Sequence, residues 1–186
     1  MHEQITGSDR MSAVAKAGQG VTGYAVVSGY WEVEIYDPEG NLIYDYIHNL
    51  VVDEGLNELL IQALTGGTQT TTWYVGLIDS TPTVAAGDTM GSHSGWAEAT
   101  GYDEAARQTW SSGAVSGQSV DNSGSPAAFT ISSDSTTVGG AFLASDDTKG
   151  GTTGKLYAAG AFSGGDVTLS AGSTINVTAT FTTAAA

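Results

Sequence analysis

The stretch YWEVEIYDPEGNLIYDYI, residues 30–47, decides the fold class that this sequence predicts. In its first half, Trp31, Val33 and Ile35 alternate with Glu32 and Glu34. This period of two is typical of a β-strand that buries one face and leaves the other in water. The first half therefore predicts a strand whose acidic face is solvated.

The second half of the stretch alternates again, after a turn signal of Pro, Glu, Gly and Asn at positions 38–41. Leu42, Tyr44 and Tyr46 fall on one side of the predicted strand, and Asp45 falls on the other. We therefore expect a β-hairpin with one apolar face and one wet, acidic face.

A helix is predicted directly after the hairpin, because the hydrophobic period changes there from two to 3.6. Asp53 is the expected N-cap and Gly66 the expected stop, so we predict one helix over residues 53–64. We expect its apolar stripe to pack on the sheet. The stripe consists of Leu56, Leu59, Leu60, Ala63 and Leu64.

The pattern of the rest of the chain predicts short strands separated by Gly, Ser, Asp or Pro. The clearest is STINVTATFT, in which Ile175, Val177, Ala179 and Phe181 share one face. Many short strands with turns between them predict a mainly β protein, an antiparallel β-sandwich of jelly-roll or immunoglobulin-like type with the helix inserted. The other predicted strands lie in TTTWYVGLI, GWAEAT, RQTWSSGAV, AAFTIS, VGGAFLAS and GKLYAAGAF.

We assign residues 23–186 to this sandwich domain and residues 1–22 to an extended N-terminal arm. The arm is rich in small residues and has no sustained period. We see no apolar run long enough to cross a bilayer and no recognisable signal peptide, so we expect neither a membrane span nor export by that route.

The charge balance also limits the partners. The net charge is -15, from 20 acidic and 5 basic residues, and the basic residues are scattered. Neutralising phosphates needs clustered Lys or Arg, so we expect no nucleic-acid or anionic-membrane partner. The chain contains no cysteine, which excludes disulfides and thiolate chemistry.

The loop DTMGSHSGWAE, residues 88–98, resembles a catalytic loop because His93 lies between Ser92 and Ser94. It lacks the G-x-S-x-G pattern of a nucleophile elbow, and no helical pattern follows it. The three histidines, which include His2 and His48, have no metal-binding spacing. We therefore expect no catalytic residue and no zinc site, with His93 as a loop residue.

Acidic residues beside turns leave a calcium site as an alternative, but none follows a regular ligand repeat. We interpret them as side chains that close turns. The acids concerned are Asp79, Asp88, Asp121, Asp146 and Asp147.

Glycine-rich stretches lack the P-loop pattern, so we expect no cofactor.

Aromatic residues are the best candidates for an interface, because they bury large areas and dominate binding energies. An alternative for Trp73, Trp96 and Trp110 is stacking on sugars, as in carbohydrate-binding sandwiches. The predicted interface residues are Trp31, Tyr36, Tyr44, Trp73, His93, Trp96 and Trp110.

From about Trp31 onward, the order of the pieces GLNELL, YVGLID, DTM and TINVTATF resembles a family of small tailed-bacteriophage structural proteins. The resemblance implies a non-enzymatic virion protein, first of all a head decoration (cement) protein. Such a protein would be made in the host cytoplasm and would bind the major capsid protein on the outer capsid surface. It also implies a homotrimer whose arm reaches between capsid subunits. A tail, fibre or head-to-tail component is the alternative, and a carbohydrate-binding module is a weaker one.

Overall fold

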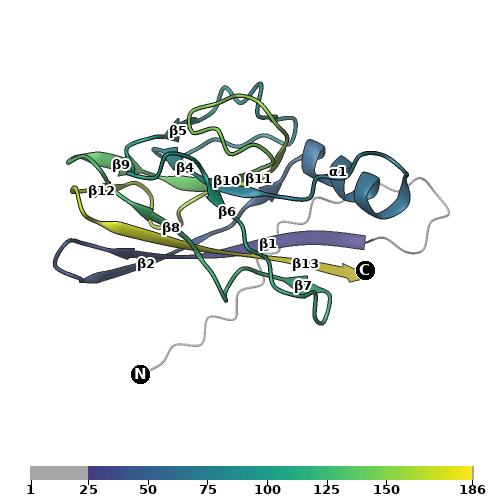
Figure 1. Cartoon of the computed structure of the whole chain (residues 1–186), viewed down its shortest axis with the longest axis horizontal. Coiled ribbons are helices and arrows are strands. Elements are labelled where there is room, and N and C mark those ends of the chain that lie inside the picture. The colour runs from purple at the N-terminus through teal and green to yellow at the C-terminus, as the bar shows by residue number, and fades with distance from the viewer. Residues whose placement is uncertain (1–24, 186) are drawn as a thin grey trace.

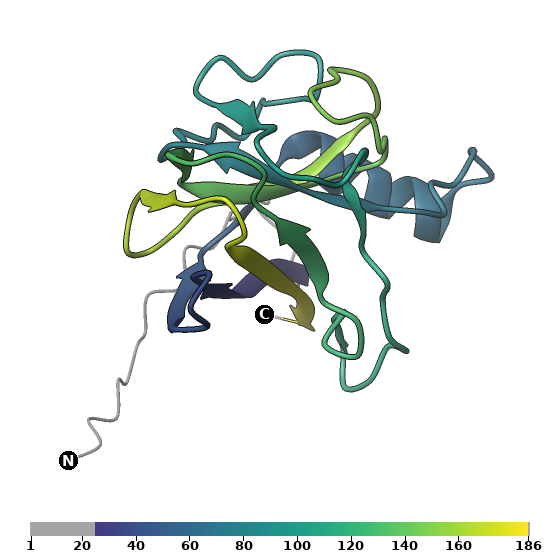
Figure 2. The same ribbon diagram turned by 60° about the vertical axis from the view of Figure 1, so that its left-hand side comes forward.

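The computed structural model describes residues 25–185, except for the side chain of Tyr44, so the predicted arm at 1–22 lies outside the described residues. The fold is a mainly β, antiparallel sandwich with one helix, as predicted. Figures 1 and 2 show the two packed layers, with β1, β2 and β13 in one and β4, β10 and β11 in the other.

The first sheet is built around two long strands, β1 (Ala25–Tyr36) and β13 (Thr174–Ala185), which pair along their whole length from Ala25↔Ala185 to Tyr36↔Thr174. This pairing joins the beginning and the end of the described chain. The sheet order is β2-β1-β13-β7, and β8 also pairs with β13. The shorter strands are β2 (Leu42–Ile47), β7 (Ser119–Val120) and β8 (Ala127–Thr130).

The second sheet has the order β3-β11-β10-β4-β5, and β6 also pairs with β4. Its strands are β3 (Leu50–Val51), β4 (Tyr74–Asp79), β5 (Ala97–Ala99), β6 (Gln108–Thr109), β10 (Gly140–Ala144) and β11 (Leu156–Ala161). A small third sheet pairs β9 (Thr136–Val138) with β12 (Val167–Leu169).

The main core lies between the two large sheets and confirms the alternation predicted for β1 and β13. Trp31, Val33 and Ile35 have no exposed surface, and Phe181 is 6% exposed. Each large apolar side chain that is fully buried in this way stabilises the fold by about 1.5–3 kcal/mol. On β13 the other inward residues are Ile175, Val177 and Ala179.

A second core covers the opposite face of the second sheet, so this sheet is buried on both sides. Phe142 and Ile78 point to this side, where Met90 and Trp96 from the 80–96 segment pack over them. As a result all five residues of β10 are buried. The near-continuous apolar run of β10 is typical of a strand covered on both faces.

The hairpin differs from the prediction in its second strand. Asp45, expected on the wet face, is only 6% exposed and pairs opposite Val33. Its carboxylate accepts hydrogen bonds from the Ser163 hydroxyl at 2.6 Å and from the Gly164 N–H at 3.1 Å. These donors offset the cost of burying the charge. Tyr46 faces outward instead and is 37% exposed.

The helix α1 (Asp53–Leu64) has the predicted limits, but its buried face was predicted only in part. Leu56 packs against the main core and Leu59 is half-buried, as expected of the stripe. Leu60 and Leu64 are 53% and 76% exposed, whereas Glu58 is buried. The helix instead approaches β11 through Gly55, where a Cβ would lie 2.2 Å from the Tyr157 carbonyl oxygen. The N-cap is also not Asp53 but the residue before it, Val52, which makes no side-chain cap.

Among residues 25–185, no helix has the length and apolar character needed to span a membrane.

Candidate functional site

One candidate interface is the water-facing side of the β2-β1-β13 layer, which we call the outer face. On β1 and β13 its residues alternate with core residues, so the strand period presents a row of side chains to solvent. The outer face consists of Tyr30, Glu32, Glu34 and Tyr36 on β1, Leu42 and Tyr46 on β2, and Asn176, Thr178, Thr180 and Thr182 on β13.

Aromatic rings gather at one end of the outer face. The ring centroids of Tyr30 and Tyr46 are 5.3 Å apart, and the His48 ring lies edge-on to Tyr30 at 6.2 Å. Partial burial, together with the neighbouring Tyr46, raises the pKa of Tyr30 above its ordinary value of 10.0. Tyr30 therefore stays a neutral hydroxyl at physiological pH, and this end of the face is an amphipathic aromatic surface.

The middle of the outer face is acidic. Glu32 is exposed and pairs across the sheet with Tyr46, and Glu34 accepts a 3.3 Å hydrogen bond from the Tyr36 hydroxyl. Partial desolvation and the Glu34 charge raise the pKa of Tyr36. The strands β1, β2 and β13 contain no Lys or Arg. The face therefore combines aromatic surface with negative charge that no basic residue of its own strands offsets.

The three basic side chains of the described chain are engaged elsewhere. Arg107 forms a bidentate ion pair with Glu98, with nitrogen–oxygen distances of 3.1 and 2.7 Å. The Lys149 ammonium donates to the Tyr102 carbonyl at 2.9 Å and lies 4.3 Å from the centre of the same residue's ring. Lys155 pairs with Glu58. None of these three cations is free to neutralise the outer face.

A second candidate site is a pocket of about 220 Å³ between the two sheets, beside α1, which we call the aromatic pocket. Its wall combines residues far apart in the sequence, because α1, β7, β10, β11 and β13 meet there. It is lined by Glu58, Leu59, Gln62, Thr70, Trp73, Trp110, Val120, Leu143, Tyr157 and Phe181.

The aromatic rings of the pocket pack edge to face in a series. Trp73 meets Tyr157 at 5.2 Å, Tyr157 meets Phe181 at 5.1 Å, and Trp110 meets Phe181 at 5.8 Å between centroids. The Trp110 indole N–H also donates to the Ala179 carbonyl at 3.2 Å. Burial raises the pKa of Tyr157. These contacts pack the side chains of the wall against one another, so the aromatic wall is formed without a ligand.

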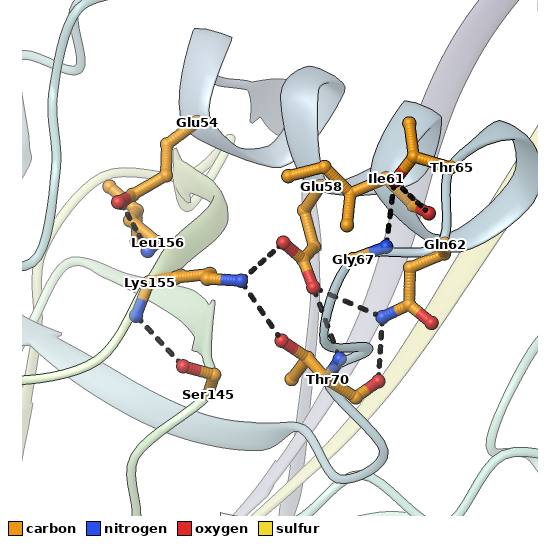
Figure 3. A network of polar contacts seen from close by, with 10 residues as sticks. All are labelled: Glu54, Glu58, Ile61, Gln62, Thr65, Gly67, Thr70, Ser145, Lys155 and Leu156. Carbon is orange, nitrogen blue, oxygen red and sulfur yellow. Dashed lines mark hydrogen bonds and ion pairs between the residues drawn. The ribbon is translucent and has the colours of Figure 1, made fainter.

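The polar residues Glu58, Gln62 and Thr70 line one side of the aromatic pocket, which we call its polar rim. Figure 3 shows the hydrogen bonds that they form. The Glu58 carboxylate accepts hydrogen bonds from the Thr70 N–H at 3.1 Å, from the Gln62 amide at 3.2 Å and from the Lys155 ammonium. Burial disfavours the charge of Glu58, but the hydrogen bonds from Lys155 and Thr70 outweigh it and hold its pKa below 4.5. The same network ties α1 to β11, because Glu54 accepts a bond from the Leu156 N–H at 2.7 Å.

The structure separates the seven predicted interface residues. Tyr36 lies on the outer face, and the register places Tyr44 opposite Glu34, although its side chain is outside the described part. Trp31 lies in the main core, with no exposed surface. Trp96 is 8% exposed and belongs to the second core. Two others, Trp73 and Trp110, meet in the aromatic pocket.

The seventh, His93, has a packing role. Its ring stacks on Trp96 at 3.9 Å with an interplanar angle of 22°, and its Nδ1 lies 3.1 Å from the Trp96 carbonyl oxygen. The Trp96 indole N–H in turn donates to Asp88 at 3.1 Å. His93 therefore lies in a loop, as predicted, and helps to hold Trp96 over the second sheet.

The sequence missed several residues of both sites. Tyr46 was missed because the second strand of the hairpin was assigned to the wrong face. Tyr30 was missed because its ring contact with Tyr46 depends on the pairing of β1 with β2. Tyr157 and Phe181 line the pocket, but they are 24 residues apart and only tertiary contacts bring them together. The period of two in β1 was the one local signal that pointed toward the outer face.

Two of the five acids beside turns, Asp121 and Asp146, close their turns as expected. Asp121 accepts a hydrogen bond from the Ser123 N–H at 2.8 Å, and Asp146 accepts one from the Thr148 N–H at 2.9 Å. These bonds lower the pKa of both carboxyl groups. Within residues 25–185 there is no cluster of three or more His, Cys, Asp or Glu that could hold a metal ion.

Comparison of the chain with protein-family models, with curated proteins and with solved structures gave no match.

Proposed function

We propose that this protein is a non-enzymatic structural protein of a bacteriophage particle, a capsid decoration protein that attaches through its outer face. The observation that carries the proposal is the composition of that face. Tyr30, Tyr36 and Tyr46 lie beside Glu32 and Glu34 on β1 and β2, and neither these strands nor β13 contains a Lys or Arg. Tyrosines provide contact area at low entropic cost, and the carboxylates select a basic partner surface.

The rigidity of this sheet supports an attachment role. The β1 and β13 strands pair over 12 residues, and the residues behind the outer face are fully packed core. A surface on such a support loses little conformational freedom on binding. The resemblance in the order of the sequence pieces adds the choice of a phage particle and of the major capsid protein as the partner.

The proposal is tested by co-sedimentation with capsids that lack the protein. We expect the double variant Glu32→Lys/Glu34→Lys to bind at least about tenfold more weakly at low salt, because it reverses the charge of the face. The matched control is Asp79→Lys/Asp147→Lys, which makes the same charge change at exposed positions outside the first sheet. The control should bind like the wild-type protein.

Equal binding by both double variants would refute the outer face as the attachment surface. Binding of the wild-type protein to isolated tails but not to heads would replace the decoration proposal with the tail, fibre or head-to-tail alternative. The homotrimer and the outer-capsid location are parts of the same proposal. Analytical ultracentrifugation tests the trimer, and labelling of intact particles tests the location.

The carbohydrate-binding alternative is less well supported. It requires an exposed tryptophan platform, yet Trp31 and Trp96 are buried and Trp73 and Trp110 are half-buried in the pocket wall. The edge-to-face contacts of these last two also cover parts of their rings. We therefore do not propose a glycan as the partner.

A further inference from the structure

The aromatic pocket has no part in the proposed attachment. Its walls come from both sheets and from α1, and Phe181 points into it from β13, on the opposite side of the strand from the outer face. The pocket is therefore a second site, separate from the outer face.

The rim of the pocket indicates an uncharged ligand. The Glu58 carboxylate already has three partners in Thr70, Gln62 and Lys155, and the Glu58–Lys155 pair leaves the rim without net charge. A charged group entering the pocket would lose its hydration without gaining an opposite charge, which is costly.

The walls and the size of the pocket define the ligand further. Four aromatic side chains and three aliphatic ones line it, so its surface favours an apolar ring. Its volume of about 220 Å³ is smaller than the roughly 300–1,000 Å³ of pockets for drug-sized molecules. A space of this size suits one side chain, in the way that an anchor residue fills a pocket at a protein interface.

We propose that the aromatic pocket binds one uncharged aromatic side chain presented by a partner polypeptide. The ring of the partner lies against the aromatic wall formed by Trp73, Tyr157 and Phe181, and the partner's backbone stays outside the pocket. This site is independent of the outer face, and its test needs only the isolated protein. Failure of one proposal therefore leaves the other standing.

The test is a titration followed by methyl NMR shifts of Leu59, Val120 and Leu143, which line the pocket. The probe is N-acetyltryptophanamide, an uncharged indole on a peptide backbone, and N-acetylalaninamide is the probe without a ring. We expect saturable shifts of the three residues with the indole probe, with a dissociation constant on the order of 1 mM. The alanine probe should produce none.

A matched pair of variants locates the binding. Val120→Phe fills the pocket from its β7 wall and should weaken binding at least tenfold, whereas Val115→Phe makes the same change at a position that is 75% exposed. Val115→Phe should bind within twofold of the wild-type protein. Circular dichroism shows whether both variants are folded. If Val120→Phe does not fold, the titration of the wild-type protein with the two probes decides the proposal.

Three results would overturn the proposal. The first is the absence of saturable shifts in the wild-type protein up to about 20 mM probe, well above the expected dissociation constant. The second is unchanged binding by folded Val120→Phe. The third is binding of free indole without binding of N-acetyltryptophanamide, because the pocket would then exclude a ring carried on a polypeptide.

Discussion

The Glu58 carboxylate on α1 and the Lys155 ammonium just before β11 form an ion pair across 97 residues of sequence. The Glu58 side chain is 1% exposed and that of Lys155 is 37% exposed. The pair is therefore shielded from water on the acid's side. Together with the Glu54–Leu156 hydrogen bond, it holds the helix against the second sheet (Figure 3).

Replacing Lys155 with Met should lower the free energy of unfolding by about 1–3 kcal/mol, because Glu58 stays buried without its cation. The double variant Lys155→Met/Glu58→Gln should regain part of that loss, since a neutral amide oxygen can still accept the Thr70 N–H. Urea unfolding measures both values. A double variant less stable than Lys155→Met alone would contradict this account of the pair.

Stability should fall at acid pH. The pKa values of Glu58 and Asp146 are lowered in the folded state, so their contribution is present above the unfolded values of 4.5 and 3.8 and is lost as the pH falls through the folded values. Urea midpoints should stay nearly constant from about pH 7 to 5.5 and then decrease below about pH 4.5. In Glu58→Gln the urea midpoint should decrease less steeply with falling pH than in the wild-type protein. The same slope in both proteins would show that Glu58 does not contribute to the pH dependence of stability.

Arg107 should be among the most sensitive positions in the chain. Its side chain is fully buried, pairs with Glu98, and donates to the Asp146 and Gly151 carbonyls at 2.8 and 2.6 Å. Arg107→Met leaves the Glu98 carboxylate buried without a cation, and we expect a loss of about 3–5 kcal/mol. Arg107→Lys keeps the charge but not the planar fork, so its loss should be smaller but clear. Thermal unfolding ranks the two variants against the wild-type protein. Equal stability of both variants and the wild-type protein would exclude a structural role for the Arg107–Glu98 pair.

Removing the His93 ring should destabilise the second core, which packs on the second sheet. His93→Ala loses the stacking on Trp96 and should cost about 1 kcal/mol, while His93→Phe keeps an aromatic ring there and should cost less. Chemical unfolding gives the difference in the free energy of unfolding, and tryptophan fluorescence reports the combined environment of the four tryptophans. If the alanine and phenylalanine variants are equally stable, stacking is not what His93 contributes.

Gly55 should not tolerate a side chain. A Cβ there would lie 2.2 Å from the Tyr157 carbonyl oxygen, so Gly55→Ala should destabilise the protein by about 1–3 kcal/mol despite the better helix propensity of alanine. Gly66→Ala is the control, because a Cβ at Gly66 meets nothing within 4 Å. Similar melting temperatures for the two variants would mean that α1 can move away from β11 at little cost.

Local patterns in the sequence were sufficient for the type of the main elements and for the limits of the helix, whereas β1 begins at Ala25, before the predicted stretch. The alternation of Trp31, Val33 and Ile35 with two glutamates specified β1, because the side-chain period of a strand is set by its backbone. In the same way, the change of period after residue 52 specified the helix over 53–64. The turns closed by Asp121 and Asp146 were also predictable, since such bonds form between residues two apart.

The tertiary structure decided which faces are buried and which residues meet. Asp45 is inside because Ser163 and Gly164, more than 110 residues away, supply its hydrogen bonds. Glu58 is buried on α1, where Lys155 pairs with it, while Leu60 and Leu64 are exposed.

The sequence by itself thus determined a mainly β fold with one helix, because strand and helix periods are local properties of the chain. It did not determine the composition of the outer face or the existence of the aromatic pocket. The outer face depends on the pairing register of β1 and β2, and the pocket depends on the meeting of Trp73, Tyr157 and Phe181 from three distant segments. Both are set by long-range packing, which no local window of the sequence contains.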